Sequence, residues 1–319
     1  MKKLLITRPV PDVNIAFARE HFDATIRPSA IPLTREEAIA ALAEYDAIVP
    51  TLGDDFSAAT FDAAGEFRCG VLSNVGVGYN HIDVTAARAK GVQVTNTPGV
   101  VTDATADIGM SLILAACRRA SEGERILRAG RWQGFGPMDM LGTHVTGKTL
   151  GIVGMGRIGQ AVAHRGHYGF SMPVIYFNRS KKEVDVPSRQ VETLHELMGE
   201  ADIVVVTVPV TAETKNIIDA DALAAMKPSG VFINIARGNV VDEPALIDVL
   251  ERGAIRAAGL DVYVNEPEVP ERLRVLENAV LYPHLGTAAL EVREMMGQMA
   301  LDNVLAWSEG KTLPQGLES

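Results

Sequence analysis

The sequence is poor in cysteine, which limits the kinds of site it can hold. Only two cysteines, Cys69 and Cys117, occur among 319 residues, and neither lies in a Cys-x-x-Cys or histidine-rich pattern. Two isolated thiols cannot build a disulfide framework, and their surroundings give no support to a metal site. We therefore expect both to be small buried side chains in a protein that uses no metal.

Long apolar runs and dense basic runs are also lacking. No run of about 18 apolar residues is present to cross a bilayer, and the first apolar stretch, Leu4–Ile6, is too short for the core of a signal peptide. The formal net charge is −10, which would repel a phosphate backbone. We therefore expect a cytoplasmic protein that binds neither a membrane nor a nucleic acid.

Strand-like segments alternate with helical patterns along the chain, in two series. Candidate strands of the first series are Leu4–Arg8, Asp46–Pro50, Val71–Val75 and Val92–Asn96. Candidate strands of the second are Thr149–Gly154, Val174–Asn178, Ile203–Pro209, Val231–Ala236, Ala257–Val262 and Val280–Pro283. This alternation predicts an α/β protein with parallel sheets covered by helices on both faces. A chain of 319 residues is long enough for two such domains.

Two helices stand out from this rhythm. Asp103–Arg128 contains no proline and lies between the two series, where it predicts one long helix. A final helix at about Leu290–Glu309 has no strand after it. It could therefore return to pack against the first series, which would make that domain discontinuous.

A glycine pattern at the start of the second series predicts a dinucleotide site. Gly154, Gly156 and Gly159 form Gly-x-Gly-x-x-Gly directly after an apolar strand and at the start of a helix. The first glycine permits the tight turn, the second lets a pyrophosphate approach, and the third lets helix and strand pack closely. Arg157 and Ile158 begin the helix, whose N-terminal N–H groups favour phosphate.

The end of the next strand bears on the choice of cofactor. An NAD site usually has an acidic residue there, which accepts hydrogen bonds from the ribose. Here the strand ends at Asn178 and is followed by Arg179, Ser180, Lys181 and Lys182. A guanidinium binds a 2′-phosphate through paired charged hydrogen bonds, so NADP(H) is preferred. The alternative is a solvated basic turn on an enzyme that uses NAD(H).

Three ionisable residues follow strands of the second series. Arg237, Glu266 and His284 each lie where open α/β sheets place their ligands. A guanidinium can hold a substrate carboxylate at two points, a histidine can give or take a proton near neutral pH, and a nearby glutamate would favour imidazolium. A single arginine or histidine of this kind is more often structural, so the prediction depends on the ordered set behind a dinucleotide motif.

Taken together, the glycine motif, the three ionisable residues and the segments around them resemble the D-isomer-specific 2-hydroxyacid dehydrogenase family, and the resemblance covers essentially the whole chain. The segments that carry the resemblance are Asn74–Asp83, Thr95–Gly99, Gly154–Gly159, Val208–Thr214, Asn234–Gly238, Gly259–Val262, Asn265–Pro267 and Pro283–Gly286. The missing acid at Asn178 resembles the branch of NADP-using glyoxylate and hydroxypyruvate reductases.

The resemblance implies a role for each candidate residue. Arg237 would hold the substrate carboxylate, His284 would be the acid/base, and Glu266 its partner. The backbone at Val77 and Gly78 would help to bind the carboxylate. Other residues would bind the cofactor or line the pocket: Asp261 on the nicotinamide carboxamide, Thr105 and Thr214 on the phosphates, and Pro209 and Leu52 beside the substrate.

The resemblance also implies an architecture of two doubly wound parallel-sheet domains. A flavodoxin-like substrate domain would comprise residues 1–97 and 289–319, and a Rossmann-type nucleotide domain would comprise 98–288. The long helix after residue 102 would make a homodimer, and the loop at Met138–Met140 could then reach the partner's active site.

The function implied is reduction of a small 2-oxo acid, glyoxylate or hydroxypyruvate, or oxidation of the matching 2-hydroxy acid. The main alternative is D-3-phosphoglycerate dehydrogenase or another D-2-hydroxyacid dehydrogenase of the same family. A second alternative is a dinucleotide-binding co-repressor, which could retain Arg237, Glu266 and His284 without turnover. Loss of NADPH absorbance on addition of glyoxylate or hydroxypyruvate would separate an enzyme from such a binding protein.

Overall fold

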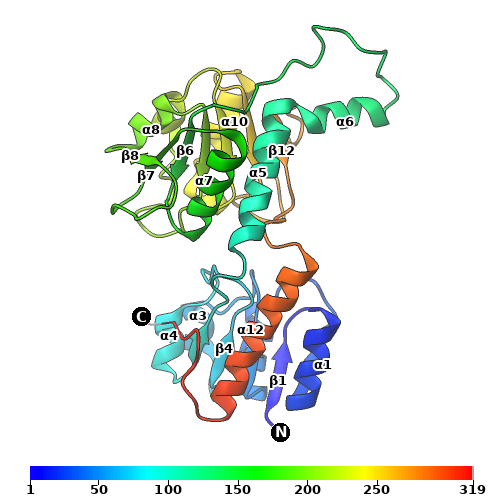
Figure 1. The fold of residues 1–319 in the computed structure, drawn as a ribbon. Helices are drawn as coiled ribbons and strands as arrows, with labels where there is room; N and C mark the ends of the chain where they lie inside the picture. The colour runs from blue at the N-terminus through cyan, green and yellow to red at the C-terminus, as the bar shows by residue number, and fades with distance from the viewer. Residues whose placement is uncertain (318–319) are drawn as a thin grey trace. The chain divides into compact units, whose positions relative to one another are not determined.

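The chain forms two compact units, each built around a parallel sheet. The computed structural model describes residues 1–317. The first unit contains Met1–Val101 and Thr287–Ser319, and the second contains Thr102–Gly286 (Figure 1). The expected boundaries, 1–97 with 289–319 and 98–288, lie within a few residues of these, and the role of each unit stays a prediction.

The first unit contains a five-stranded sheet in the order β2-β1-β3-β4-β5, all parallel. This is the flavodoxin order, in which the strand sequence reverses beside the first strand. The strands are β1 (Lys3–Ile6), β2 (Asp23–Ile26), β3 (Ala47–Val49), β4 (Val71–Ser73) and β5 (Gln93–Thr95). The helices are α1 (Asp12–His21), α2 (Arg35–Glu44), α3 (Ala58–Ala63), α4 (Val84–Ala89) and α12 (Leu290–Ser308).

Helices cover both faces of this sheet. On one face α1 and α12 pack together over β1, β3 and β4, with Ala18, Ala300 and Val304 in the core. On the other face α2, α3 and α4 enclose a core that includes Leu42 and Phe61. The start of α2 is capped by side chains, because Thr34 and Glu37 form both halves of a capping box there.

The second unit contains a seven-stranded parallel sheet in the order β12-β11-β10-β9-β6-β7-β8. This is the Rossmann order with one further strand at the β12 edge. The strands are β6 (Leu150–Val153), β7 (Val174–Phe177), β8 (Ser188–Gln190), β9 (Ile203–Val206), β10 (Val231–Asn234), β11 (Ala257–Leu260) and β12 (Ala279–Leu281). The helices are α5 (Thr102–Arg118), α6 (Ala120–Arg128), α7 (Arg157–Phe170), α8 (Leu194–Glu200), α9 (Ala220–Ala224), α10 (Glu243–Glu251) and α11 (Glu271–Arg274), with a 3-10 turn at Gly238–Val240.

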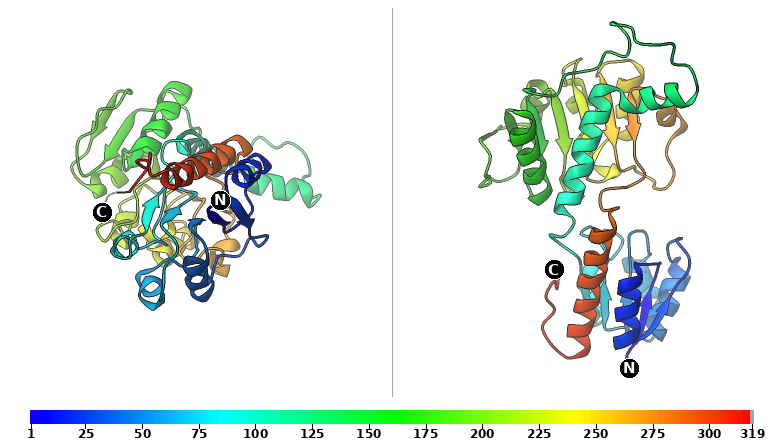
Figure 2. Two further views of the ribbon diagram at one scale, coloured as in Figure 1. Left: turned by 90° about the horizontal axis from the view of Figure 1, so that it is seen from below. Right: turned by 45° about the vertical axis from the view of Figure 1, so that its right-hand side comes forward.

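The central strands of this sheet are buried on both faces, as a layer between helices must be. Core residues of α5 and α7, such as Leu112 and Val162, cover one face. Core residues of α8 and α10, such as Leu197 and Leu246, cover the other. Figure 2 shows these layers from two further directions. The predicted fold class, α/β with two parallel-sheet domains, is confirmed.

The prediction of one helix over Asp103–Arg128 is wrong, because the chain breaks between α5 and α6. Arg119 has a left-handed backbone, with φ +54°, which a continuous helix cannot contain. After it, α6 and the loop 129–149 project from the second unit (Figure 1).

A returning segment of chain explains the break. The N–H of Thr143 donates to the carbonyl of Cys117 at 2.7 Å, which takes the acceptor that a continuing helix would use. Gly142 lies so close that a Cβ there would be 2.3 Å from the same carbonyl oxygen. The Arg119 guanidinium then pairs with Glu122 in the first turn of α6 through two hydrogen bonds.

Two further observations concern membrane-spanning helices and metal-binding clusters. Among residues 1–317, no helix is long and apolar enough to cross a membrane. In the same part of the chain, no group of three or more His, Cys, Asp or Glu side chains is arranged to hold a metal ion.

Candidate active site

Neighbouring strands of the seven-stranded sheet deliver the predicted catalytic residues to one edge. The strands β10, β11 and β12 are adjacent and parallel, so their carboxyl ends lie side by side. Arg237 follows β10, Asp261 and Glu266 follow β11, and His284 follows β12. The structure therefore brings together side chains that are up to 47 residues apart in sequence, since parallel strands all end at the same edge of a sheet.

His284 and Glu266 form a hydrogen-bonded pair. The distance from His284 Nδ1 to Glu266 Oε2 is 2.7 Å, and the two side chains are 30% and 27% exposed. A carboxylate can only accept, so Nδ1 must carry the proton. The pair therefore leaves Nε2 as the ring atom that can donate or receive a proton in a reaction.

The loop after β11 holds the Glu266 carboxylate in place. Its other oxygen, Oε1, accepts the backbone N–H of Tyr263 at 3.0 Å. Burial by itself raises the pKa of Glu266, but the hydrogen bond and charge of His284, the Tyr263 N–H and the charge of Arg237 together hold that pKa below its usual value. Glu266 is therefore an anion at neutral pH and can stabilise an imidazolium ring beside it.

His284 has a left-handed backbone, with φ +55°, which is costly for a residue with a Cβ. Asp261 stabilises this turn by accepting hydrogen bonds from three successive backbone N–H groups. Its carbonyl accepts from His284 at 3.1 Å, and its carboxylate oxygens accept from Leu285 at 2.6 Å and Gly286 at 2.8 Å. Asp261 is 1% exposed, and burial raises its pKa despite these two donors.

Arg237 lies partly buried beside the Glu266 loop. Burial lowers the pKa of its guanidinium, although the charge of Glu266 opposes this. Gly238 packs directly on the backbone after β11, because a Cβ at this position would be 2.0 Å from the carbonyl carbon of Tyr263. Asn234, 1% exposed, braces the loop by donating to the Arg237 carbonyl at 2.9 Å. The position of Arg237 is thus fixed relative to Glu266.

The three glycines of the dinucleotide motif have the distinct surroundings that their predicted roles require. Gly154 has φ +99°, and a Cβ there would be 2.7 Å from the Val208 side chain. A Cβ on Gly159 would be 2.3 Å from the Gly154 carbonyl oxygen. Gly156 has open space within 4 Å and caps α7 without any side-chain hydrogen bond. The N–H groups at Arg157 and Ile158 therefore begin a helix with an uncapped end that suits a pyrophosphate.

The residues after β7 lie beside a groove of 1170 Å³ lined by Asn178, Arg179, Lys181 and Lys182 among others. Asn178 Oδ1 accepts the N–H of Met155 at 3.2 Å, which ties this turn to the glycine loop. Within residues 1–317, Arg179, Lys181 and Lys182 make no ion pair with a carboxylate. Ser180 is exposed, and its carbonyl accepts from Asn178 at 2.7 Å.

Two other predicted cofactor residues, Thr214 and Thr105, make contacts within the protein. The Thr214 hydroxyl donates to the Pro209 carbonyl at 2.5 Å and accepts the Thr211 N–H at 2.7 Å, so it holds its own turn together. Thr105 is 7% exposed and lies close to Gly286, on the turn that Asp261 holds. Their contacts with cofactor phosphates stay predictions.

In the first unit, the remaining predicted residues lie at the carboxyl ends of β3 and β4. Leu52 is 37% exposed, and its carbonyl accepts a hydrogen bond from Arg8 at 2.6 Å. Val77 is 38% exposed, and it is followed by Gly78 in a loop whose carbonyl groups are all bound by side chains. Loops at this edge of a doubly wound sheet are where ligands bind.

Several residues that shape these loops were given no role by the sequence motifs in which some of them lie. Asn74 and Asn96 come directly after β4 and β5, and Asn234 ends β10; all three are at most 8% exposed. Glu243, at the start of α10, accepts the Val264 N–H at 3.2 Å, and burial raises its pKa. A polar residue at the carboxyl end of an apolar strand is the signal that could have identified the asparagines.

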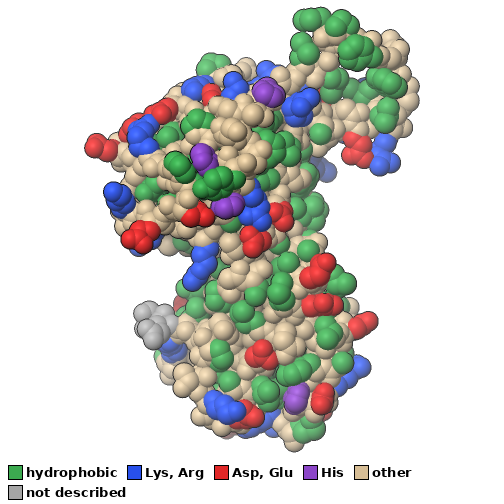
Figure 3. All heavy atoms as spheres, in the orientation of Figure 1, with side chains coloured by type: hydrophobic (Ala, Val, Ile, Leu, Met, Phe, Trp, Pro, Cys, Tyr) green, Lys and Arg blue, Asp and Glu red, His purple; other side chains and the backbone are tan. Residues whose placement is uncertain are grey.

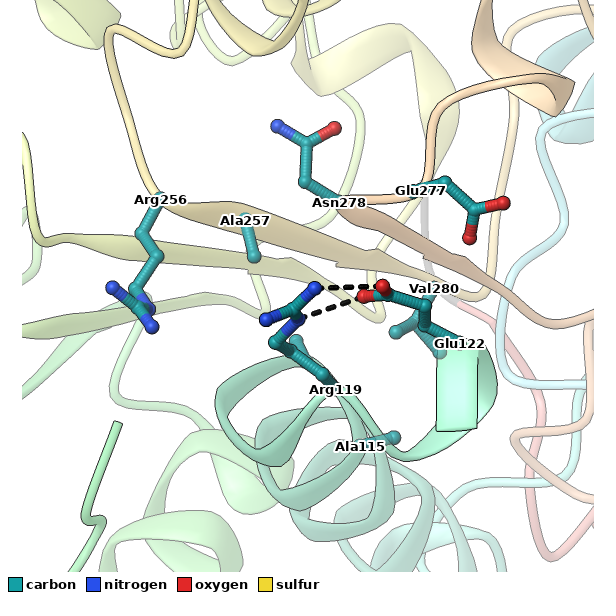
Figure 4. Close-up of a pocket in the computed structure, with 9 residues that line it drawn as sticks. Ala115, Arg119, Glu122, Arg256, Ala257, Glu277, Asn278 and Val280 are labelled. Carbon is teal, nitrogen blue, oxygen red and sulfur yellow. Dashed lines mark hydrogen bonds and ion pairs between the residues drawn. The ribbon is translucent and has the colours of Figure 1, made fainter. Parts of the chain in front are cut away.

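A separate cavity of 290 Å³ lies away from these loops, between the end of α5 and the starts of β11 and β12. Figure 4 shows Arg119 and Glu122 paired in it, with Arg256, Glu277 and Asn278 around them. None of the predicted catalytic or cofactor residues lines this cavity.

A doubly wound sheet that carries a glycine-rich turn and an arginine–glutamate–histidine set at its carboxyl edge is typical of nicotinamide-dependent dehydrogenases. The family model "D-isomer specific 2-hydroxyacid dehydrogenase, NAD binding domain" matches residues 110–286. The chain belongs to this family and is an NAD(P)-dependent 2-hydroxyacid dehydrogenase, as the sequence predicted.

Named relatives agree with this assignment. The glyoxylate reductase of Thermococcus kodakarensis is 42% identical over 98% of this chain and 95% of its own. That of Thermococcus onnurineus is 41% identical over 98% of this chain and 94% of its own. A crystal structure of NADPH-dependent glyoxylate/hydroxypyruvate reductase from Sinorhizobium meliloti, in complex with NADP and malonate, is similar with a TM-score of 0.87 and 33% identity, covering 99% of this chain and 96% of that one.

Proposed function

We propose that this protein reduces glyoxylate or hydroxypyruvate to the 2-hydroxy acid, with NADPH as the preferred cofactor. The observation that carries the proposal is the 2.7 Å hydrogen bond between His284 and Glu266, which leaves Nε2 available as the proton donor. The similarity to glyoxylate reductases over nearly the whole chain supports the choice of substrate.

The proposed reaction needs one hydride and one proton at the two ends of a carbonyl group. The glycine-rich turn and the uncapped end of α7 fit a dinucleotide, which supplies the hydride to C2 of the substrate. His284 donates a proton from Nε2 to the carbonyl oxygen, and Glu266 stabilises the ring while it is charged. Arg237 holds the substrate carboxylate. In the reverse direction His284 accepts the hydroxyl proton.

The first unit would contribute further contacts to the same substrate. The N–H groups of Val77 and Gly78 are proposed to bind its carboxylate, and Leu52 with Pro209 to limit the size of its C3 group.

Preference for NADPH is proposed from the turn after β7. Arg179, Ser180 and Lys181 would surround the 2′-phosphate, and Asn178 would not repel it because it carries no charge. Within residues 1–317, Arg179 and Lys181 form no ion pair with a carboxylate, and the Glu213 carboxylate interacts with Arg179 only through its charge. Both cations are therefore proposed to pair with an anion. NAD(H) would be the second, less favoured cofactor.

A homodimer through the projecting arm is proposed from its exposed apolar surface. The arm consists of α6 and the loop 129–149, and α6 has no buried residue. Its exposed apolar side chains include Leu127, Trp132, Phe135 and Met138. Figure 3 shows hydrophobic side chains, in green, gathered over this projecting part of the molecule. Exposed patches of this kind mark interfaces. Light scattering should give twice the mass of the chain at micromolar concentration, and a stable monomer would refute the proposal.

A substrate panel tests the proposed function directly. Purified protein would be given glyoxylate, hydroxypyruvate, pyruvate and larger 2-oxo acids, each with NADPH and with NADH, and oxidation of the cofactor would be followed by absorbance. Glyoxylate and hydroxypyruvate with NADPH should give the highest kcat/KM. A higher value for a larger acid, or for NADH, would overturn the corresponding part of the proposal.

A further inference from the structure

The loop Gly76–Gly78 has a carbonyl pattern that the proposed function does not by itself explain. Asn74 Nδ2 donates to the carbonyl oxygens of Gly76 at 3.0 Å and Gly78 at 3.1 Å. Asn96 Nδ2 donates to the carbonyl oxygen of Val77, between them, at 2.9 Å. Three successive carbonyl groups are therefore held by two side chains.

Because the peptide bond is planar, the direction of each carbonyl group fixes the direction of the next N–H group. In a trans peptide the carbonyl of one residue and the N–H of the next point in opposite directions. Because the carbonyls of Gly76 and Val77 point to the asparagines, the N–H groups of Val77 and Gly78 point away from them. Within residues 1–317, neither of these N–H groups has a protein acceptor.

The two asparagines are themselves firmly placed. Asn74 is 0% exposed, and its Oδ1 lies 3.1 Å from His81 Nε2, which must be the donor because an amide oxygen only accepts. Asn96 is 8% exposed at the end of β5. Thr97 adds a brace, since its hydroxyl accepts the Gly76 N–H at 3.0 Å and its own N–H donates to the Gly76 carbonyl.

We propose that Asn74 and Asn96 are positioning residues that set the affinity for the 2-oxo acid by fixing two N–H groups of the Gly76–Gly78 loop as carboxylate donors. This inference rests on the proposed function, in which these N–H groups bind the substrate carboxylate. Both side chains are at most 8% exposed and their amide groups donate to the loop carbonyls, so they would act through the loop. They fix the loop before substrate arrives, so less of the binding free energy is lost in ordering it.

Asn96→Leu is the main test variant, because it removes the single donor to Val77 without adding charge. With the Val77 carbonyl released, the KM for glyoxylate should rise roughly tenfold, as expected when a hydrogen bond to a charged group is weakened. The kcat should stay within about threefold and the KM for NADPH within about twofold, since His284 and the turn after β7 belong to the other unit.

Asn74→Asp is the second variant and Asn303→Leu the matched control. The aspartate keeps the acceptor for His81 but loses both donors, so the substrate KM should rise more than in Asn96→Leu. Asn303 is also 0% exposed in the first unit and donates to the Met299 carbonyl at 2.8 Å, away from the loop. Asn303→Leu should lower thermal stability by a similar amount and leave the substrate KM unchanged.

The outcomes separate this inference from the proposed function. If the parent enzyme reduces glyoxylate but Asn96→Leu keeps the parental KM, or the control raises KM equally, the positioning role is wrong and the function stands. If the parent reduces no 2-oxo acid, the proposed function fails. The positioning role of the two asparagines is then tested by measuring the binding of oxalate by calorimetry. If the parent binds oxalate and Asn96→Leu binds it roughly tenfold more weakly, the positioning role is supported. If the parent does not bind oxalate, the positioning role is overturned. Should Asn74→Asp not fold, Asn96→Leu carries the test alone.

Discussion

Asp261→Asn is the substitution that most sharply tests how the structure holds His284, the proposed proton donor. The carboxylate accepts two N–H groups, one on each oxygen, and an amide offers only one acceptor. One N–H of the turn after His284 would then face an NH2 group. Losing one charged hydrogen bond costs about 1.5–3 kcal/mol, and the left-handed backbone of His284 would lose a support that offsets about 1–2 kcal/mol of strain.

These magnitudes predict two measurable effects. A loss of about 2 kcal/mol in a unit of this size lowers Tm by about 4–8 °C. The ring of His284 would also shift, and a misplacement of about 1 Å can reduce the rate roughly 10²-fold. The assays are thermal unfolding and steady-state reduction of glyoxylate, with KM measured separately for NADPH and for glyoxylate.

Asp242→Asn is the matched control for this change. Asp242 also accepts a backbone N–H, from Ala245 at 3.1 Å as the N-cap of α10, and asparagine is an equally good N-cap. Its Tm and kcat should stay close to the parent values. If Asp261→Asn raised the KM for NADPH while kcat and Tm were unchanged, Asp261 would act on the nicotinamide, and the argument from the His284 turn would be refuted.

The remaining predictions concern the acid, the cofactor and pH. His284→Gln should still bind NADPH by fluorescence titration but lose roughly 10²–10⁴-fold in kcat; a parental rate would show that another group is the acid. Asn178→Asp with Arg179→Ala should move the NADPH/NADH ratio of kcat/KM toward NADH by more than about tenfold, whereas an unchanged ratio would mean that this turn is only solvated. Because the pKa of Glu266 is lowered in the folded protein, its stabilising effect is complete above the usual glutamate range and is lost as pH falls through the lowered value. Unfolding free energies of parent and Glu266→Gln should therefore converge on acidification, and a gap that widened instead would contradict the lowered pKa.

The sequence predicted the strands that are apolar and missed those that are not. The central strands were recognised because burial on both faces requires continuous apolar runs. The edge strands β2 (Asp23–Ile26) and β8 (Ser188–Gln190) are partly or wholly exposed, so they lack such runs and were not predicted. Edge strands are defined by pairing with a distant neighbour, which no local pattern reveals.

The break between α5 and α6 was missed for a related reason. The residues around Arg119 favour helix, and the segment that ends it, at Gly142 and Thr143, is more than 20 residues away in the chain. The candidate residues Arg237, Glu266 and His284 could be picked out from the sequence because their motifs follow strands directly. The side chains that hold each motif in place could not be predicted in this way, because they are neighbours in space and not in sequence.

That support has a common physical form in both units. A loop that must present N–H groups or a strained histidine has to hold its other polar groups within the protein, since buried groups left without partners are costly. Asn74 and Asn96 do this for the Gly76–Gly78 loop, and Asp261 does it for His284. Each lies within one residue of the carboxyl end of a parallel strand, whose backbone is paired with its neighbours in the sheet. Short amide and carboxylate side chains at these positions therefore fix the loops, which explains how the motifs within each unit keep their geometry.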